Sequence, residues 1–333
     1  RYDLLEAPSA LALQLKPFLA FRNIHCLTHQ NAEADTEGRE IPGGVAYRLY
    51  QAFPDLNMQL SDAKAVFGQD PQWYNNITYS DEFRRGFDCR EDLLVPGVFE
   101  CRLKPGESVV FSASTALEDP KTFKRRFNSY VAKAGAVNSY HDVLLRNADQ
   151  LITDHNNRKR INAGLTWMYT GLLRETLQAL PGLTLYGMHS PALFEEILDN
   201  LIADEQERLF SRTTQVEAPL YLASVLQKYI DDFGADPAKV WKKYGSTVRG
   251  VLESYLPGVR KEVAMTDEGL LWARVDGVAL TWMNAYINGR AVTERAGYQV
   301  ETNAFWYNSI CFALEMEQKF PTEDSAEFVA RWT

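Results

Sequence analysis

The sequence predicts a mixed β and α chain in two parts, an antiparallel β-sandwich over residues 1–118 followed by helical hairpins over residues 119–333. Up to about residue 115, short runs of alternating polar and apolar residues are separated by Pro/Gly turns, for example at residues 104–107, which is typical of antiparallel strands. From about Asp119, apolar residues recur every three or four positions. That period is typical of amphipathic helices.

Each strand is expected in a run that is alternating or rich in β-branched and aromatic residues. The runs are Ala10–Leu15, Val45–Phe53, Asn57–Leu60, Trp73–Tyr79, Val98–Leu103 and Ser108–Ser112, with a strand and long loop expected in Pro17–Thr28 and a turn at residues 68–71. Residues 80–92 form a dense mixed-charge segment, which is expected to be a solvated or interdomain surface.

The helices are expected where the three- and four-residue spacing holds. They are Pro120–Ala134, Ser139–Thr153, Leu172–Tyr186, Pro191–Ala203, Ala218–Phe233, Pro237–Tyr255 and Asn303–Phe320, with short strands or extended chain at Gly269–Ala273 and Ala291–Val300. Ser190 and Asp236 each precede a proline, so both are predicted to cap a helix that has proline at its first position.

The composition is that of a globular protein, with 46% hydrophobic and 24% charged residues. A net charge of −9 argues against nucleic acid or an anionic membrane as partner, and no apolar run approaches the roughly 20 residues that span a bilayer. The four cysteines and five histidines show no metal-ligand spacing, and Gly-rich phosphate loops are absent. We therefore expect reduced thiols, a cytoplasmic location, and neither metal nor cofactor.

The two ends of the sequence are abrupt. The chain begins at Arg1 without a signal-like segment, and Glu327–Thr333 resembles a helix cut before its end. A fragment or processed chain is therefore expected, and the oligomeric state is not predicted.

Aromatic and polar side chains gather at four expected helix starts, within residues 167–182, 210–219, 280–286 and 300–308. In a closed toroid of helices these junctions would converge on one pocket. Aromatic faces pack against sugar rings, and glycoside hydrolysis needs two carboxyl groups, so a sugar-binding pocket is predicted. Taken singly, a Trp or Tyr at such a position favours a core role, and a lone Glu favours a surface role.

Several segments, in order along the chain, resemble the archaeal/bacterial glycogen-debranching enzymes, the amylo-α-1,6-glucosidases. They are Leu15–Arg22 (LKPFLAFR), Trp73–Tyr79 (WYNNITY), Glu91–Phe99 (EDLLVPGVF), Gly269–Ala273 (GLLWA), Leu280–Met283 (LTWM) and Val300–Asn308 (VETNAFWYN). The resemblance implies a β-sandwich followed by an (α/α)6 toroid. It also implies metal-free, inverting hydrolysis of α-1,6-linked glucose in glycogen or branched maltooligosaccharides.

The resemblance also implies an incomplete toroid, because six helical pairs need more residues than 119–333 supply, and it places the general base beyond Thr333. Arg174, Glu175, Trp282, Asn284 and Tyr307 are the predicted substrate-binding residues.

Asn284 stands where the family has an aspartate, a leading candidate for the general acid. An amide cannot donate a proton as an acid, so Glu217 or Glu301 is the candidate catalytic residue instead. Two alternatives stay open. One is a non-catalytic or weakly catalytic glucan-binding protein on a degenerate glycosidase fold. The other is an enzyme of another specificity, such as a phosphorylase, although no basic phosphate-binding cluster is present.

Overall fold

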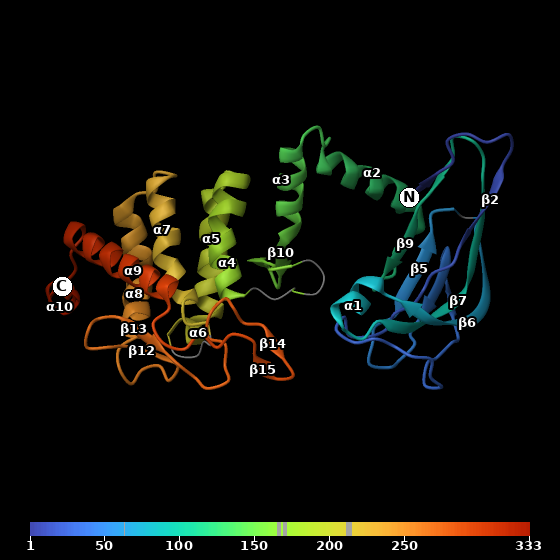
Figure 1. Cartoon of the computed structure of the whole chain (residues 1–333). Helices are drawn as coiled ribbons and strands as arrows, with labels where there is room; N and C mark the ends of the chain where they lie inside the picture. Colours follow the sequence, from blue (N-terminus) through green and yellow to red (C-terminus); the bar gives the residue numbers. More distant parts are fainter. Residues whose placement is uncertain (63, 165–167, 169–171, 211–214) are drawn as a thin grey trace. The chain divides into compact units, whose positions relative to one another are not determined.

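The computed structural model describes the whole chain except residues 63, 165–167, 169–171 and 211–214. The chain divides into two compact units, Arg1–Ala136 and Val137–Thr333. Antiparallel sheets are the main regular structure of the first unit, and helices make up most of the second (Figure 1). The predicted succession of β and then α structure is confirmed, while the sandwich, the toroid and the boundary at residues 118/119 stay predictions.

The described residues of the first unit form three antiparallel sheets, with strand orders β3-β4-β5-β9, β2-β7-β6 and β1-β8. Its strands are β1 (Tyr2–Asp3), β2 (Leu11–Leu15), β3 (Arg39–Ile41), β4 (Gly44–Tyr47), β5 (Leu56–Leu60), β6 (Val66–Thr78), β7 (Arg90–Leu103), β8 (Ser108–Val109) and β9 (Phe111–Ser114). Its helices are α1 (Ser80–Arg85), η1 (Pro120–Thr122) and α2 (Phe123–Ala134).

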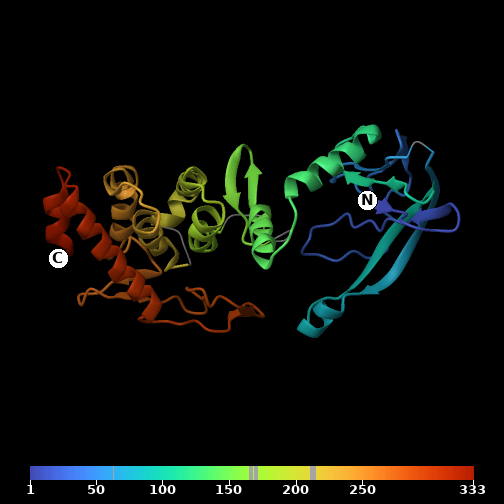
Figure 2. The same cartoon turned by 90° about the horizontal axis from the view of Figure 1, so that it is seen from above.

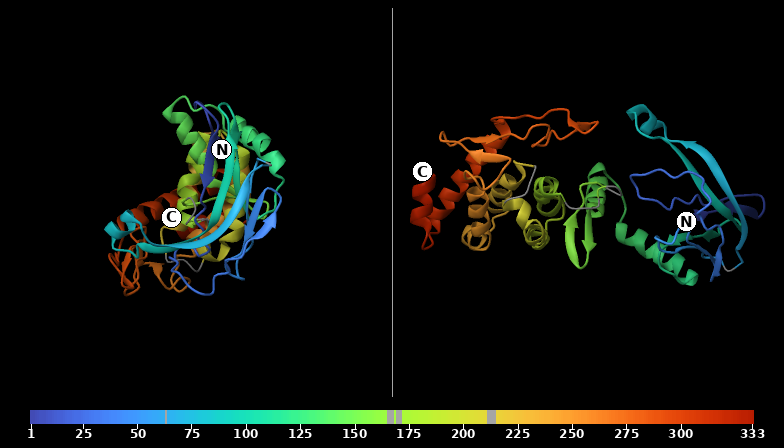
Figure 3. Two further views of the ribbon diagram at one scale, coloured as in Figure 1. Left: turned by 90° about the vertical axis from the view of Figure 1, so that its right-hand side faces the viewer. Right: turned by 90° about the horizontal axis from the view of Figure 1, so that it is seen from below.

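Both larger sheets of this unit contribute to one hydrophobic core. Tyr47 and Met58 from the four-stranded sheet and Leu94 and Phe99 from the three-stranded sheet belong to the same buried cluster. Because successive strand residues point to opposite faces, the alternating pattern that predicts the strands also supplies this core. Figure 3 shows the long curved β6–β7 ribbon with α1 at its tip.

Four predictions for this unit were wrong. The predicted turn at residues 68–71 lies inside β6, because a register irregularity between Gln69 and Gln72 absorbs Pro71, which has no N–H to donate. The predicted strand Val45–Phe53 ends at Tyr47. Pro17–Thr28 forms no strand beyond an isolated bridge at Leu19. The charged segment 80–92 is not wholly solvated, because it contains the buried Glu91.

Among its described residues, the second unit consists of helices, three short antiparallel strand pairs and two isolated bridges. Its helices are α3 (Tyr140–Leu151), α4 (Leu173–Leu180), η2 (Pro181–Gly187), α5 (Pro191–Asp204), α6 (Gln206–Phe210), η3 (Ala218–Leu220), α7 (Tyr221–Asp231), α8 (Pro237–Glu253), α9 (Val300–Lys319) and α10 (Ser325–Trp332). Its strands are β10 (Ile152–His155), β11 (Arg158–Ile161), β12 (Val263–Met265), β13 (Leu271–Ala273), β14 (Tyr286–Ile287) and β15 (Arg290–Ala291).

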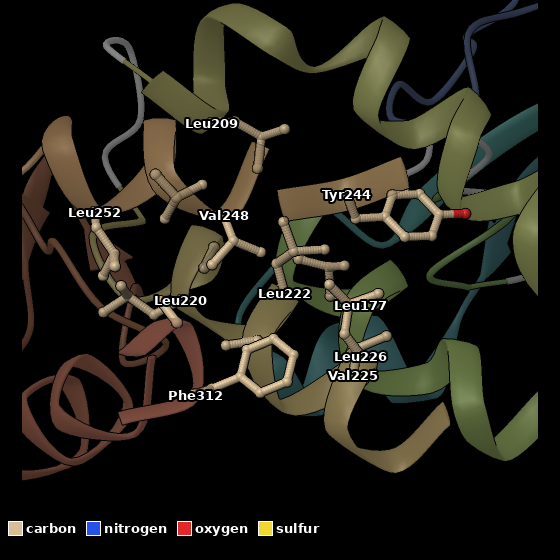
Figure 4. Close-up of a cluster of buried hydrophobic side chains, with 14 of the residues drawn as sticks. Leu177, Leu209, Leu220, Leu222, Val225, Leu226, Tyr244, Val248, Leu252 and Phe312 are labelled. Atoms are coloured by element: carbon tan, nitrogen blue, oxygen red, sulfur yellow. The ribbon is translucent and has the colours of Figure 1, made fainter. Parts of the chain in front are cut away.

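The helical predictions are confirmed to within a few residues, including both caps. The Ser190 side chain accepts a hydrogen bond from the Leu193 amide, and the Asp236 side chain accepts one from the Ala238 amide. Helix α7 contacts both α4 and α9, and side chains of these helices and of α8 interdigitate in the core (Figure 4). None of the helices that the structure describes is long and apolar enough to cross a membrane.

The segment from β12 to β15 lies across one end of the helices. Figure 1 shows these strands below α4, α5, α7 and α8, and Figure 2 shows the segment beside the helices seen end-on. Val216, just before η3, donates its amide to the Leu280 carbonyl at 2.9 Å. The fold therefore brings the starts of α4, η3 and α9 to the same end as this segment.

Candidate active site

Three helix starts supply the charged side chains of the candidate site. Arg174 and Glu175 lie in the first turn of α4, Glu217 directly precedes η3, and Glu301 is the second residue of α9. Carboxylates are favourable at helix N-termini, where backbone N–H groups have no partner within the helix. The contacts among α4, η3 and α9 bring these residues, which are far apart in the sequence, into one cluster.

Glu217 and Arg174 form a buried ion pair. Glu217 is 0% exposed and Arg174 is 3% exposed, and Arg174 Nη1 lies 3.2 Å from Glu217 Oε1. Arg174 Nε also lies 3.6 Å from Glu175 Oε1. Yet neither oxygen of Glu217, nor Arg174 Nε or Nη2, has a hydrogen-bond partner among the described residues. Buried polar atoms in proteins are normally bonded, so this cluster has free hydrogen-bonding capacity for a ligand.

Burial raises the pKa of the Glu217 carboxyl, because removal from water disfavours the charged form. The backbone amide of Glu217, the positive charge of Arg174 and the backbone amide of Trp282 oppose this rise, whereas the negative charge of Glu301 adds to it. The net direction is upward. Such a carboxyl group retains its proton to higher pH than an ordinary glutamate does, which is the property that a general acid requires.

Glu301 is held in its charged form. Arg295 donates to both of its oxygens, with Nη2 2.8 Å from Oε2, and Trp282 Nε1 donates to Oε1 at 2.9 Å. The hydrogen bond from Arg295 is the main reason that the pKa of Glu301 is lowered to about 2. The two predicted catalytic carboxyl groups thus lie in opposite electrostatic environments.

Trp282 presents a large exposed aromatic surface beside this pair. Its side chain is 55% exposed, and the Arg295 guanidinium lies 6.0 Å from its ring. The neighbouring Thr281 is buried, and its hydroxyl oxygen accepts a hydrogen bond from Arg295 at 3.2 Å. An exposed indole fixed by its own N–H is suited to packing against the C–H face of a sugar ring.

Two protein-family models match the chain. Residues 1–110 match the family described as glycogen debranching enzyme N terminal, and residues 145–332 match the family described as amylo-alpha-1,6-glucosidase. The chain belongs to the amylo-α-1,6-glucosidase family. No curated protein and no solved structure matches it.

Membership of the amylo-α-1,6-glucosidase family establishes a glycoside hydrolase domain and confirms the resemblance drawn from the sequence motifs. The matched segment contains the whole cluster from Arg174 to Glu301. Among the residues that the structure describes, no group of His, Cys, Asp and Glu side chains is arranged to hold a metal ion.

Two of the predicted site residues, Asn284 and Tyr307, make no hydrogen bond or ion pair with the described residues of the cluster. Asn284 is exposed, and its side chain has no hydrogen bond to any described residue. Tyr307 is 71% exposed and interacts with Cys311 one turn further along α9. Tyr307 follows Glu301 by six residues, which turns it to a different face of the helix. Their predicted roles in this member of the glucosidase family stay predictions. Residues 167 and 169–171 of the first predicted junction and residues 211–214 of the second lie outside the described part.

The sequence motifs missed two members of the cluster. Arg295 holds Glu301, and its positive φ of 53° is rare for a residue other than glycine. Tyr221 packs against Phe305, with ring centroids 4.4 Å apart, and the charges of Glu217, Arg174 and Glu301 influence the pKa of its hydroxyl. Arg295 lies inside the stretch that predicted the sugar pocket, but no local pattern indicates that it pairs with Glu301.

Proposed function

We propose that this protein hydrolyses α-1,6-linked glucose at the branch points of glycogen or limit dextrin, with inversion at the anomeric carbon. The observation that carries the proposal is the buried Arg174–Glu217 pair, in which both Glu217 oxygens and Arg174 Nε and Nη2 have no hydrogen-bond partner among the described residues. Membership of the amylo-α-1,6-glucosidase family supports the substrate class. A sugar hydroxyl or the glycosidic oxygen supplies the partner that Glu217 lacks.

Glu217 acts as the general acid in this proposal. Cleavage needs a proton on the glycosidic oxygen as the C–O bond breaks, and a carboxyl group with a raised pKa supplies it. Arg174 and Glu175 bind hydroxyl groups of the departing or retained sugar, and Arg174 stabilises the Glu217 carboxylate once the proton has left.

Glu301 has a supporting role in the proposed mechanism. Both of its oxygens are occupied by Arg295 and Trp282, and its low pKa keeps it from donating a proton. Its pairing with Arg295 instead holds the Trp282 indole, on which a glucosyl ring packs.

The test is glucose release from a limit dextrin by the full-length protein, with the anomer of the first product followed by NMR. We expect β-glucose first, and a loss of about 10³-fold in kcat for Glu217→Gln, within the range that general acid catalysis supplies. Glu315→Gln, which changes an exposed glutamate on α9, is the matched control and should keep wild-type turnover.

A Glu217→Gln variant with wild-type turnover contradicts the acid assignment. Absence of glucose release above the blank, together with measurable maltooligosaccharide binding, contradicts the enzymatic proposal. That second outcome supports the alternative of a glucan-binding protein, which the amide at Asn284 in place of the family aspartate favours.

A further inference from the structure

Both backbone polar groups of Val216, the residue immediately before Glu217, form hydrogen bonds. The Val216 amide donates to the Leu280 carbonyl at 2.9 Å, and the Val216 carbonyl accepts a hydrogen bond from the Tyr255 hydroxyl at 2.5 Å. Val216 is itself buried. Its two backbone bonds therefore fix the peptide plane from which Glu217 continues into η3.

Tyr255 is well suited to hold this position. It is completely buried just beyond the end of α8, and its ring packs against Trp306 with centroids 5.4 Å apart. Burial raises the pKa of its hydroxyl, so the hydroxyl keeps its proton and acts as a donor. Because the ring is completely buried and packs against Trp306, its hydroxyl gives the Val216 carbonyl a donor at one defined position.

Arg260 contacts Tyr255 and forms hydrogen bonds with its surroundings. Its guanidinium lies 4.6 Å from the Tyr255 ring centroid. It donates to Ser254 Oγ through Nε at 3.0 Å and to the Leu209 carbonyl through Nη2. The Tyr255–Arg260 pair thus bonds to backbone carbonyls at both Leu209 and Val216.

We propose that Tyr255 is a positioning residue that sets the depth of Glu217 in the site through its hydrogen bond to the Val216 carbonyl, with Arg260 as its support. The inference rests on the proposed function, in which Glu217 is the general acid. Loss of the Tyr255 hydroxyl leaves the Val216 carbonyl without a partner and lets the Glu217 carboxyl move toward water. A displacement of about 1 Å in a catalytic group can lower the rate by up to about 100-fold.

The test compares Tyr255→Phe with Tyr244→Phe. Tyr244 is a second buried tyrosine, whose hydroxyl bonds to Asp199 Oδ1 at 2.9 Å away from Glu217, so its variant controls for loss of a buried hydroxyl. For Tyr255→Phe we expect kcat to fall about tenfold or more, KM to change by less than about twofold, and the high-pH limb of kcat to move to lower pH. Tyr244→Phe should keep the wild-type pH profile.

A second readout does not depend on turnover. The Glu217 carboxyl is titrated by NMR in ¹³C-glutamate-labelled protein, with its signal assigned from Glu217→Gln. In Tyr255→Phe its pKa should fall toward that of an ordinary glutamate, because a more hydrated carboxyl ionises more readily. An unchanged pKa in folded Tyr255→Phe overturns the inference whether or not the wild type hydrolyses dextrin. Absence of wild-type hydrolysis contradicts the proposed function alone.

Discussion

Two glutamates, Glu91 in the first unit and Glu217 in the second, are both inaccessible to solvent and yet lie in opposite environments. Each is 0% exposed. Glu91 accepts hydrogen bonds from Arg22 Nη2 at 3.0 Å, from the Tyr79 hydroxyl at 2.5 Å and from the Thr28 amide at 3.1 Å. Glu217 has Arg174 beside it but no hydrogen-bond partner among the described residues.

Depth of burial and hydrogen bonding together decide the charge of the two groups, because the Glu217 carboxyl is enclosed more deeply by protein atoms than that of Glu91. Burial opposes ionisation at both sites, but at Glu91 the bonds from Arg22, Tyr79 and Thr28 outweigh it and lower the pKa. At Glu217 burial prevails and the pKa is raised. At Glu91 both carboxylate oxygens accept hydrogen bonds, and the carboxylate thereby links the chain around Thr28 to strand β7. At Glu217 the oxygens accept no such bonds, and the carboxyl group is therefore suited to exchanging a proton with a ligand.

The largest expected effect of this contrast is on turnover. Glu217→Gln should lower kcat by about 10³-fold because it removes the acid. Glu91→Gln should leave kcat of the folded protein within about threefold, since Glu91 belongs to the other compact unit. The measurement is glucose release from limit dextrin by protein shown to be folded by circular dichroism. Equal losses in the two variants contradict the contrast.

The next effect is on stability, with the order of the two residues reversed. Glu91→Gln should destabilise the first unit by about 3 kcal/mol, because it leaves the half-buried Arg22 guanidinium without its carboxylate. Glu217→Gln also removes the carboxylate partner of the buried Arg174 guanidinium, but it should cost less, because burial already disfavours the charge of Glu217 and its oxygens accept no side-chain hydrogen bond from a described residue. Urea unfolding followed by far-ultraviolet circular dichroism measures both, and a larger loss for Glu217→Gln is the contrary result.

The pH dependence should also have opposite signs at the two sites. The lowered pKa of Glu91 contributes stability above the ordinary glutamate pKa of about 4.3, which is lost as pH falls through the folded-state value. Glu301 behaves likewise, losing its contribution between about 4.3 and its folded pKa of about 2. Hydrolysis should instead be lost as pH rises through the raised pKa of Glu217. Unfolding and kcat measured over one pH series test the two signs together.

The smallest expected effect is that of Asn284→Asp, which restores the family aspartate. Asn284 is exposed and has no hydrogen bond to a described residue, so the new carboxyl would have an ordinary environment. We expect kcat within about threefold of wild type, equivalent to about 0.6 kcal/mol. A tenfold or greater increase would instead assign the acid to position 284 and reduce Glu217 to a binding residue.

Local patterns predict the elements of this fold well and its irregularities poorly. Helix α8 and its Asp236 cap follow from a cap residue, a proline and a three- and four-residue spacing. The β10–β11 hairpin was missed, although Asn156 and Asn157, both with positive φ, mark its turn. The strand β6 runs through Pro71 because a bulge accommodates it, and no pattern within the strand indicates that bulge.

The candidate site was predicted only in part, for a related reason. Arg174, Glu175, Glu217 and Trp282 could be proposed from motifs at helix starts, and these residues do lie in the cluster. The pairing of Arg295 with Glu301 depends on a backbone conformation in the left-handed region, and the contrast between Glu91 and Glu217 depends on partners distant in sequence. Burial and hydrogen bonding are tertiary properties, so neither follows from residue type and spacing.

The protonation state of Glu217 tests the central claim most directly. Infrared spectra over a pH series distinguish the carbonyl stretch of a protonated carboxyl from the bands of carboxylates, and ordinary glutamates titrate around a pKa of about 4.3. We predict that the difference spectrum of wild type minus Glu217→Gln contains a protonated-carboxyl band that is lost at higher pH than the signal of the other glutamates, and that this band is kept in folded Glu91→Gln. A difference band that titrates together with the ordinary glutamates would contradict the claim that burial raises the pKa of Glu217.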